Sequence, residues 1–179
     1  MHIKETFIKD LLILSPSVFT DERGYFLESY NKKRIASKLA VEFVQDNESM
    51  SQKGVLRGLH FQKPPYAQGK LVRVITGSVL DVVVDLRKKS TTYGKHFKHI
   101  LSCKNKEQLY VPEGFGHGFL VLENDTIFSY KCTNYYNKDA ELSLAWNDPT
   151  LAINWEIEDP IISEKDKNAQ NFFNFSTPF

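Results

Sequence analysis

The sequence has few cysteines, almost no net charge and no long hydrophobic run, and each absence removes a class of protein. Among its 179 residues there are only 2 cysteines, Cys103 and Cys132, in no metal-binding or redox spacing. We expect two buried structural thiols in a reduced, cytoplasmic protein. Lysine and arginine number 23 against 22 aspartates and glutamates, without a basic stripe, so we expect no nucleic-acid partner. No apolar run is long enough for a membrane span, and Met1 to Phe7 lacks the apolar core of a signal peptide, so we expect neither.

Short apolar runs separated by polar turns dominate the chain, which we expect to form one domain over residues 1–179. The pattern predicts strands at 11–14, 18–19, 25–30, 55–61, 71–75, 80–86, 97–102, 108–111, 118–122, 126–133 and 142–146. In the run 80–86, the even-numbered residues share one face and the odd-numbered residues the other. Many short strands at regular spacing indicate an all-β sandwich or barrel. Only two helices are expected, over Lys32 to Leu39 with Asn31 as the N-cap, and a short one after Ser163.

The stretch from Gly54 to Lys70 concentrates charged and titratable residues. Val55 to Phe61 is apolar enough for a buried strand, yet it contains Arg57 and His60, and an unpaired charge in a core is costly. The two have opposite parity, so a regular strand would point them to opposite faces. Gly58 lies between them and can host a β-bulge that re-aims one side chain; without that bulge, one of the two does not belong to the site.

Polar residues also occur within other predicted strands. If the sheet closes, we expect His60, Lys70, Asp81, His117 and Tyr130 to face one interior cavity. All of these except Lys70 have an ordinary structural alternative. A single histidine can be a hydrogen-bonded core residue, the tyrosine can be tied to backbone, Asp81 can be exposed, and the glycines around His117 can simply form a turn.

One motif raises the question of a metal. Pro112, Gly114 and His117 are similar to the second half of the cupin metal motif. The His-x-His pair of the first half is absent, since Phe61 and Gln62 follow His60. Catalytic metals usually need three protein ligands, and no third stands out. We therefore expect a cupin barrel without metal or other cofactor, and a metal-dependent cupin oxygenase stays as an alternative.

Six motifs in fixed order then make a specific resemblance. They are Arg-Gly-Leu-His-Phe-Gln (57–62), Pro-Pro-x-Ala-Gln-Gly-Lys-Leu-Val-Arg-Val (64–74), Asp-Val-Val-Val-Asp-Leu-Arg (81–87), Pro-x-Gly-Phe-x-His-Gly-Phe (112–119), Tyr-Lys-x-Thr (130–133) and Trp-Asn-Asp-Pro (146–149). Nearly the whole chain, from 21–24 to 163–166, resembles the dTDP-4-dehydrorhamnose 3,5-epimerase family. The resemblance implies an antiparallel cupin-type jelly-roll barrel, a metal-independent homodimer and a dTDP-4-keto-6-deoxy sugar as substrate.

The resemblance also implies residue roles. His60 matches the catalytic base, Asp166 its acidic partner, Tyr130 the general acid, and Lys70 the residue beside the C4 oxygen. Positions that match substrate contacts are Arg23, Glu28, Gln45, Asp46, Asn47, Arg57, His117, Glu141 and Lys165, with Tyr136 near the nucleotide base. Asp81, expected in the same cavity, is predicted to contact substrate as well.

These side chains suit the reaction on chemical grounds. The C–H groups at C3 and C5 of a 4-keto sugar are acidic, and inversion needs a base on one face, an acid on the other and a group that holds the enolate oxygen. A neutral histidine is a base near pH 7, and a tyrosine with a reference pKa of about 10 can act as the acid. A lysine can stabilise the oxyanion, and Arg57 and Arg23 suit a pyrophosphate.

Three alternatives remain open. A related epimerase could invert only C3 or only C5, or use another nucleotide sugar, with the same catalytic groups. A cupin that only binds a sugar nucleotide would take up no solvent deuterium into its ligand. A metal-dependent oxygenase would carry bound metal when purified.

Overall fold

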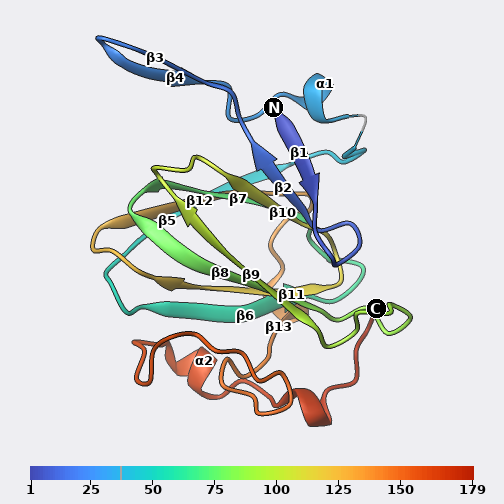
Figure 1. Ribbon diagram of the computed structural model, residues 1–179. Coiled ribbons are helices and arrows are strands. Elements are labelled where there is room, and N and C mark those ends of the chain that lie inside the picture. Colours follow the sequence, from blue (N-terminus) through green and yellow to red (C-terminus); the bar gives the residue numbers. More distant parts are fainter. Residues whose placement is uncertain (37) are drawn as a thin grey trace.

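The computed structural model describes residues 1–36 and 38–179, in which two antiparallel sheets stack face to face (Figure 1). The first sheet contains, in spatial order, β1 (His2–Glu5), β2 (Leu12–Ser15), β10 (Gln108–Val111), β7 (Lys70–Thr76), β12 (Thr126–Cys132) and β5 (Gln45–Ser51). The second contains β13 (Glu141–Ser143), β6 (Leu56–Gln62), β11 (Phe115–Val121), β8 (Ser78–Asp85) and β9 (His96–Ser102). This antiparallel jelly roll is the predicted fold class.

The space between the sheets is filled by the inward-facing residues of both. In β8, Val79 and Val83 belong to this inner cluster, whereas Leu80, Val82 and Val84 belong to a second cluster on the outer face. The predicted alternation of this strand is therefore confirmed. Both faces of β8 are buried, because the C-terminal segment covers its outer side. Burial of each such side chain contributes roughly 1.5–3 kcal/mol to stability.

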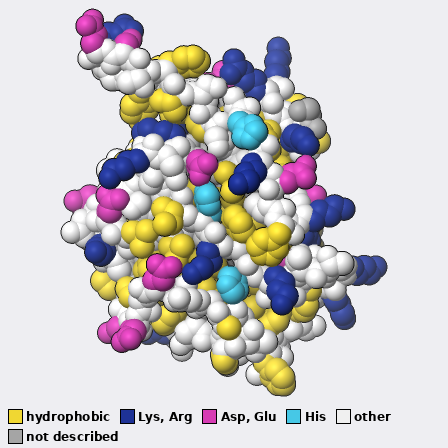
Figure 2. Space-filling model, viewed as in Figure 1, with side chains coloured by type: hydrophobic (Ala, Val, Ile, Leu, Met, Phe, Trp, Pro, Cys, Tyr) yellow, Lys and Arg dark blue, Asp and Glu magenta, His cyan; other side chains and the backbone are white. Residues whose placement is uncertain are grey.

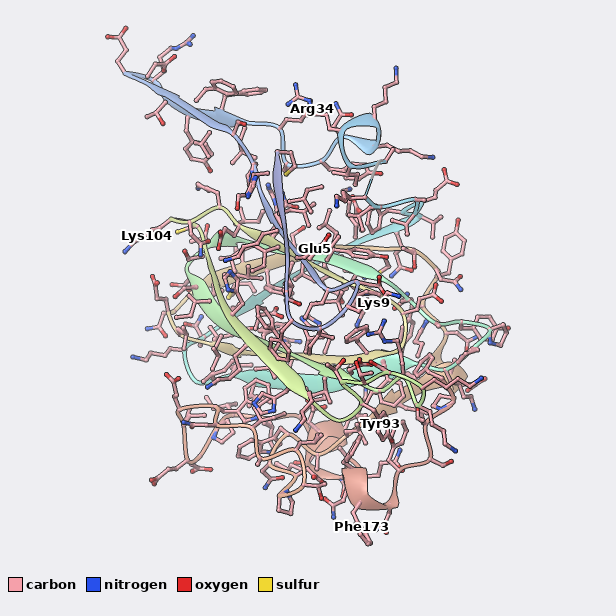
Figure 3. All side chains as sticks on the ribbon, turned by 45° about the vertical axis from the view of Figure 1, so that its right-hand side comes forward. Glu5, Lys9, Arg34, Tyr93, Lys104 and Phe173 are labelled. Atoms are coloured by element: carbon pink, nitrogen blue, oxygen red, sulfur yellow. The ribbon has the colours of Figure 1, made fainter. Side chains whose placement is uncertain are left out.

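Short helices cover the outer faces of the two sheets (Figure 1). Helix α1 (Lys32–Ile35) packs Ile35 against the six-stranded sheet, and Asn31 caps it by accepting hydrogen bonds from two backbone N–H groups. Helix α2 (Glu164–Lys167) lies on the outer side of the five-stranded sheet, with 3₁₀ turns at Lys138–Ala140 and Phe172–Asn174. Figure 3 shows Arg34 on α1 and Phe173 on the C-terminal segment at opposite ends of the molecule.

The structure corrects several predicted bounds. The helix expected over Lys32 to Leu39 ends at Ile35 and continues only as turns, and this range includes Ser37, which lies outside the described residues. Strand β5 was not predicted, because its inward-facing residues are polar and carry no hydrophobic alternation. Cys132 is buried and Cys103 only partly so, and both thiols are free.

Strands β3 (Val18–Asp21) and β4 (Gly24–Leu27) form a separate hairpin, here called the arm, that projects from the body (Figure 1). Its exposed apolar side chains are Val18, Phe19, Tyr25 and Phe26, the two phenylalanines at 65% and 69% exposure. Figure 2 shows hydrophobic atoms along the arm and charged ones at its tip. Within the described residues, no helix is long and apolar enough to cross a membrane.

Candidate active site

The two sheets enclose a cavity of about 490 Å³ that collects most of the titratable residues singled out above. His60 on β6 and His117 on β11 reach it from the five-stranded sheet. Lys70 on β7 and Tyr130 on β12 reach it from the six-stranded sheet. The prediction that these four side chains line one cavity is confirmed, and the cavity holds candidate bases and acids on opposite walls.

A bulge in β6 turns both Arg57 and His60 toward this cavity. His60 pairs with His117 of β11, but Arg57 pairs with Phe119, so β6 uses one more residue than β11 over the same span. Gly58 has φ of +128°, a conformation that glycine adopts readily and other residues do not. The predicted bulge at Gly58 is confirmed, and it removes the parity conflict between the two side chains.

Asp166 reaches His60 from the C-terminal segment. The Nε2 atom of His60 lies 2.5 Å from Oδ1 of Asp166, whose side chain is 2% exposed. Ser163 caps α2 by accepting a hydrogen bond from the Asp166 N–H, which fixes the carboxylate in place. Burial alone would raise the pKa of Asp166, but hydrogen bonds and charge from His60 outweigh it and hold that pKa below its usual value. The carboxylate can therefore orient the ring and stabilise an imidazolium.

Lys70 and Tyr130 lie next to each other on neighbouring strands. The Lys70 Nζ atom is 5.9 Å from the centre of the Tyr130 ring. Burial lowers the pKa of Lys70, and burial also raises the pKa of Tyr130. The tyrosine hydroxyl therefore keeps its proton at neutral pH and can donate it.

Asp81 is placed differently from the prediction. It is fully buried behind His117, and its two carboxylate oxygens lie 3.0 and 2.9 Å from the His117 Nε2 atom. It does not line the cavity, so the expectation of a direct substrate contact is wrong. Its effect on the cavity passes through His117, which it orients.

A second polar cavity of about 100 Å³ adjoins the first at His60, Lys70 and Tyr130. Its lining also includes Gln45, Asn47, Gln62, Gln68, Tyr136 and Glu141. The Gln45 side chain donates to Asn47 at 3.1 Å and accepts from the Tyr136 N–H at 3.0 Å. Amide groups both donate and accept hydrogen bonds, so this wall suits a neutral polar ligand group.

Glu141 connects this second cavity to α2. Its carboxylate lies 2.5 Å from the Lys165 Nζ atom and accepts a hydrogen bond from the Tyr136 hydroxyl at 2.9 Å. Burial would raise the pKa of Glu141, but Lys165 and Tyr136 outweigh it and lower that pKa. Lys165, Glu141 and Tyr136 thus form a polar chain along the cavity rim.

Three predicted contact residues do not reach the cavity of their own chain. Asp46 lies on the opposite face of β5, where its carboxylate pairs with Lys131 at 2.9 Å, because alternate residues of a strand face opposite ways. Arg23 lies on the arm with its side chain 85% exposed and pairs with Asp21. Glu28 follows the arm and pairs with Arg34 at 3.1 Å. Strand parity turns Asp46 away from the cavity. The projecting arm carries Arg23, and Glu28 directly after it, away from the cavity.

A larger cavity of about 780 Å³ lies elsewhere, between the β1–β2 connection and residues 38–42. Its charged side chains are largely paired with one another: Lys38 with Glu5 at 3.2 Å, and Arg87 with Asp10 at 2.9 Å. Glu5 and Lys9, labelled in Figure 3, are among its lining residues. The acid–base groups lie in the smaller cavity, which is therefore the candidate active site.

Comparison with known proteins agrees with this geometry. The family model of dTDP-4-dehydrorhamnose 3,5-epimerase matches residues 5–174. The chain belongs to this family. It is 52% identical over 174 residues to the dTDP-4-dehydrorhamnose 3,5-epimerase of Shigella flexneri, covering 96% of each chain.

Solved structures of the epimerase family superpose on it closely. A crystal structure of the enzyme from Elizabethkingia anophelis NUHP1 has a TM-score of 0.93 at 51% identity and covers 97% of both chains. The Legionella pneumophila Philadelphia 1 enzyme, in complex with dTDP-4-keto-L-rhamnose, has a TM-score of 0.93 at 46% identity, over 98% of this chain and 94% of that one.

Several residues that line the active-site cavity were not predicted from the sequence. Phe119 and Phe128 line it with ring centres 4.1 Å apart, and Ser49 lies beside them. The phenylalanines have the pattern of ordinary core residues, and only their position two residues from His117 and Tyr130, on the same strand face, could have drawn attention to them. Within residues 1–36 and 38–179, no three His, Cys, Asp or Glu side chains cluster closely enough to hold a metal ion.

Proposed function

We propose residue roles for this chain, which is an isomerase. It epimerises C3 and C5 of dTDP-4-dehydro-6-deoxy-D-glucose to give dTDP-4-dehydro-L-rhamnose in dTDP-L-rhamnose biosynthesis. One observation carries the residue roles: His60 and Tyr130 enter one cavity from opposite sheets, with Lys70 beside Tyr130. A sugar ring between the walls has a base on one face and an acid on the other.

His60 removes the proton from C5 or C3. The buried Asp166 carboxylate holds its ring and stabilises the imidazolium that forms, as an acidic partner does for other catalytic histidines. Each removal leaves an enolate whose negative charge gathers on the C4 oxygen. Lys70, partly buried at the cavity wall, stabilises that oxygen, and its loss is expected to lower the rate about 10²–10³-fold.

Tyr130 returns a proton from the opposite face and so completes the inversion. Burial raises its pKa, so the hydroxyl is protonated at neutral pH and ready to donate. The same three groups act at the second carbon, since both C–H bonds are alpha to the same ketone, once His60 has released its proton to solvent and Tyr130 has taken one up. No step calls for a metal or an organic cofactor, and this stays a prediction for the dialysed enzyme to test.

Charged and polar side chains at the site contact the nucleotide part of the substrate. Arg57 binds the pyrophosphate, because a guanidinium matches phosphate oxygens in a bidentate manner. Gln45 and Asn47 contact the substrate, the exposed ring of Tyr136 lies near the nucleotide base, and Glu141 and Lys165 fix the rim. His117, oriented by Asp81, completes the sugar pocket.

The arm supports a homodimer. Its exposed phenylalanines and tyrosine form an apolar surface that the body of the same chain leaves uncovered. Arg23 on the arm and Glu28 directly after it do not line the cavity of their own chain and reach the site of the second protomer in this arrangement. The single domain over residues 1–179 and the cytoplasmic location are proposed with it.

The test is an assay with dTDP-4-keto-6-deoxyglucose in deuterated water. A 3,5-epimerase places deuterium at both C3 and C5 and yields the L-rhamno product. Label at one carbon identifies an epimerase of one centre, and binding without label identifies a non-catalytic cupin. The same sample after treatment with a strong chelator shows whether activity depends on metal.

A further inference from the structure

Arg57 is held at the cavity by a serine that is not among the predicted site residues. Its Nε and Nη2 atoms donate to the Ser51 Oγ atom at 3.3 and 3.0 Å. Ser51 is the last residue of β5 and is 6% exposed, whereas Arg57 is an exposed side chain of β6. The contact therefore joins the edge strand of one sheet to the opposite sheet, and a buried hydroxyl orients the guanidinium.

Arg57 has no acidic partner among the described residues, so its contact with Ser51 leaves its positive charge available to a ligand. The arginines that form ion pairs within residues 1–36 and 38–179 are Arg23, Arg34 and Arg87. Arg57 is not one of them. A carboxylate would orient the guanidinium but also cancel its charge, whereas a hydroxyl orients it and leaves the full charge for an anion. Its Nη1 group makes no hydrogen bond to the described residues and stays free for a ligand.

The position of Ser51 follows from the strand. Inward-facing residues of β5 alternate along Gln45, Asn47, Ser49 and Ser51, so the hydroxyl lies on the cavity side at the far end from the amides. An apolar side chain there would leave the guanidinium without this acceptor.

We propose that Ser51 is a positioning residue for nucleotide binding that acts through Arg57, pre-orienting the guanidinium toward the pyrophosphate. This rests on the proposed function. Ordering a long side chain before binding removes part of the entropy cost of association. The residue touches no reacting atom, so it affects substrate affinity and leaves the proton transfers unchanged.

The experiment measures binding of dTDP and of thymidine to the full-length protein by calorimetry, alongside kcat and KM. Ser51→Ala is expected to weaken dTDP binding about 3- to 10-fold and to raise KM similarly, with kcat and thymidine binding unchanged. Ser51→Thr, which keeps the hydroxyl, should restore most of the affinity. Ser129→Ala, the same change on the other face of this sheet, is the matched control and should bind dTDP like the wild type.

A double-mutant cycle separates this role from a structural one. Arg57→Ala should weaken dTDP binding by more than about 10-fold, and adding Ser51→Ala to it should change nothing further. Equal losses in both backgrounds, or an equal loss for thymidine, would overturn the proposal. If Ser51→Ala does not fold, Ser51→Thr and Ser51→Cys take its place in the same cycle. A dTDP affinity that does not depend on the side chain at position 51 would contradict the proposal. A wild type that binds dTDP without epimerising the sugar contradicts the proposed function alone.

Discussion

The Nε2 atom of His60 lies 2.5 Å from Oδ1 of Asp166, although 106 positions separate the two residues in the chain. The bulge at Gly58 presents the imidazole, and the capped turn of α2 presents the carboxylate. The contact between His60 and Asp166 therefore depends on two local features from distant parts of the sequence.

Replacing the carboxylate tests that pair. Asp166→Asn keeps the shape but removes the charge that stabilises the imidazolium, so kcat should fall about 10²-fold or more. Stability should also change with pH. The pKa of Asp166 is lower folded than unfolded, so its contribution is present above the ordinary value of 3.8 and is lost as the pH falls through the folded value. Urea unfolding should show a larger gap between wild type and variant at pH 7 than at pH 3; a constant gap would contradict this assignment.

Lys70 should show a trade between stability and activity. Burial lowers its pKa, so the folded protein carries the cost of a desolvated cation. Lys70→Met fills similar space without charge, so the free energy of unfolding should rise while kcat falls about 10²–10³-fold. Thermal unfolding and kcat measured on one preparation check both, with the exposed Lys53→Met as control. A variant that is both destabilised and active would count against an oxyanion role.

The glycine at the bulge has a close steric limit. A Cβ atom on Gly58 would lie 2.8 Å from the His117 carbonyl oxygen, whereas one on Gly24, with a similar φ of +125°, would meet nothing within 4 Å. Gly58→Ala should therefore lose more than Gly24→Ala, which carries only the backbone strain of about 1–3 kcal/mol. Chemical unfolding of both variants measures the difference. Equal losses would show that backbone strain, and not the contact with β11, makes glycine necessary.

The arm can be tested by mixing two inactive variants. If Arg23 serves the other protomer's site, an equal mixture of Arg23→Ala and His60→Ala, unfolded and refolded together, contains mixed dimers with one whole site. Half of the dimers are mixed, so activity should recover to ~25% of wild type. Sedimentation establishes the dimer in the same samples. Activity no greater than the sum of the separate variants would mean that Arg23 acts in its own chain or not at all.

Much of the fold could be predicted because its strands carry clear patterns. The alternation of 80–86 and the glycine between Arg57 and His60 gave the buried strand and the bulge. Strand β5 escaped prediction because it presents amides and hydroxyls inward, where hydrophobic periodicity gives no signal.

The site was harder to predict than the fold where a role depends on which way a side chain points. Asp46 and Asn47 are neighbours in the sequence but face opposite sides of the sheet. Asp81 is hidden behind His117, and Arg23 lies on an arm whose direction no local pattern specifies. The contact of Ser51 with Arg57 joins two sheets and is visible only in the folded chain.

We propose that His60 forms the enolate and that Tyr130 completes the inversion from the other side of the cavity. Comparing solvent deuterium exchange with inversion in Tyr130→Phe and His60→Ala tests both roles at once. Tyr130→Phe keeps the base and Lys70, so the enolate still forms and is reprotonated on the face that it left.

Exchange in Tyr130→Phe should therefore exceed inversion, with inversion slowed about 10²–10⁴-fold, and His60→Ala should lose both. Equal loss of exchange and inversion in Tyr130→Phe, or continued exchange in His60→Ala, would contradict this assignment of the two roles.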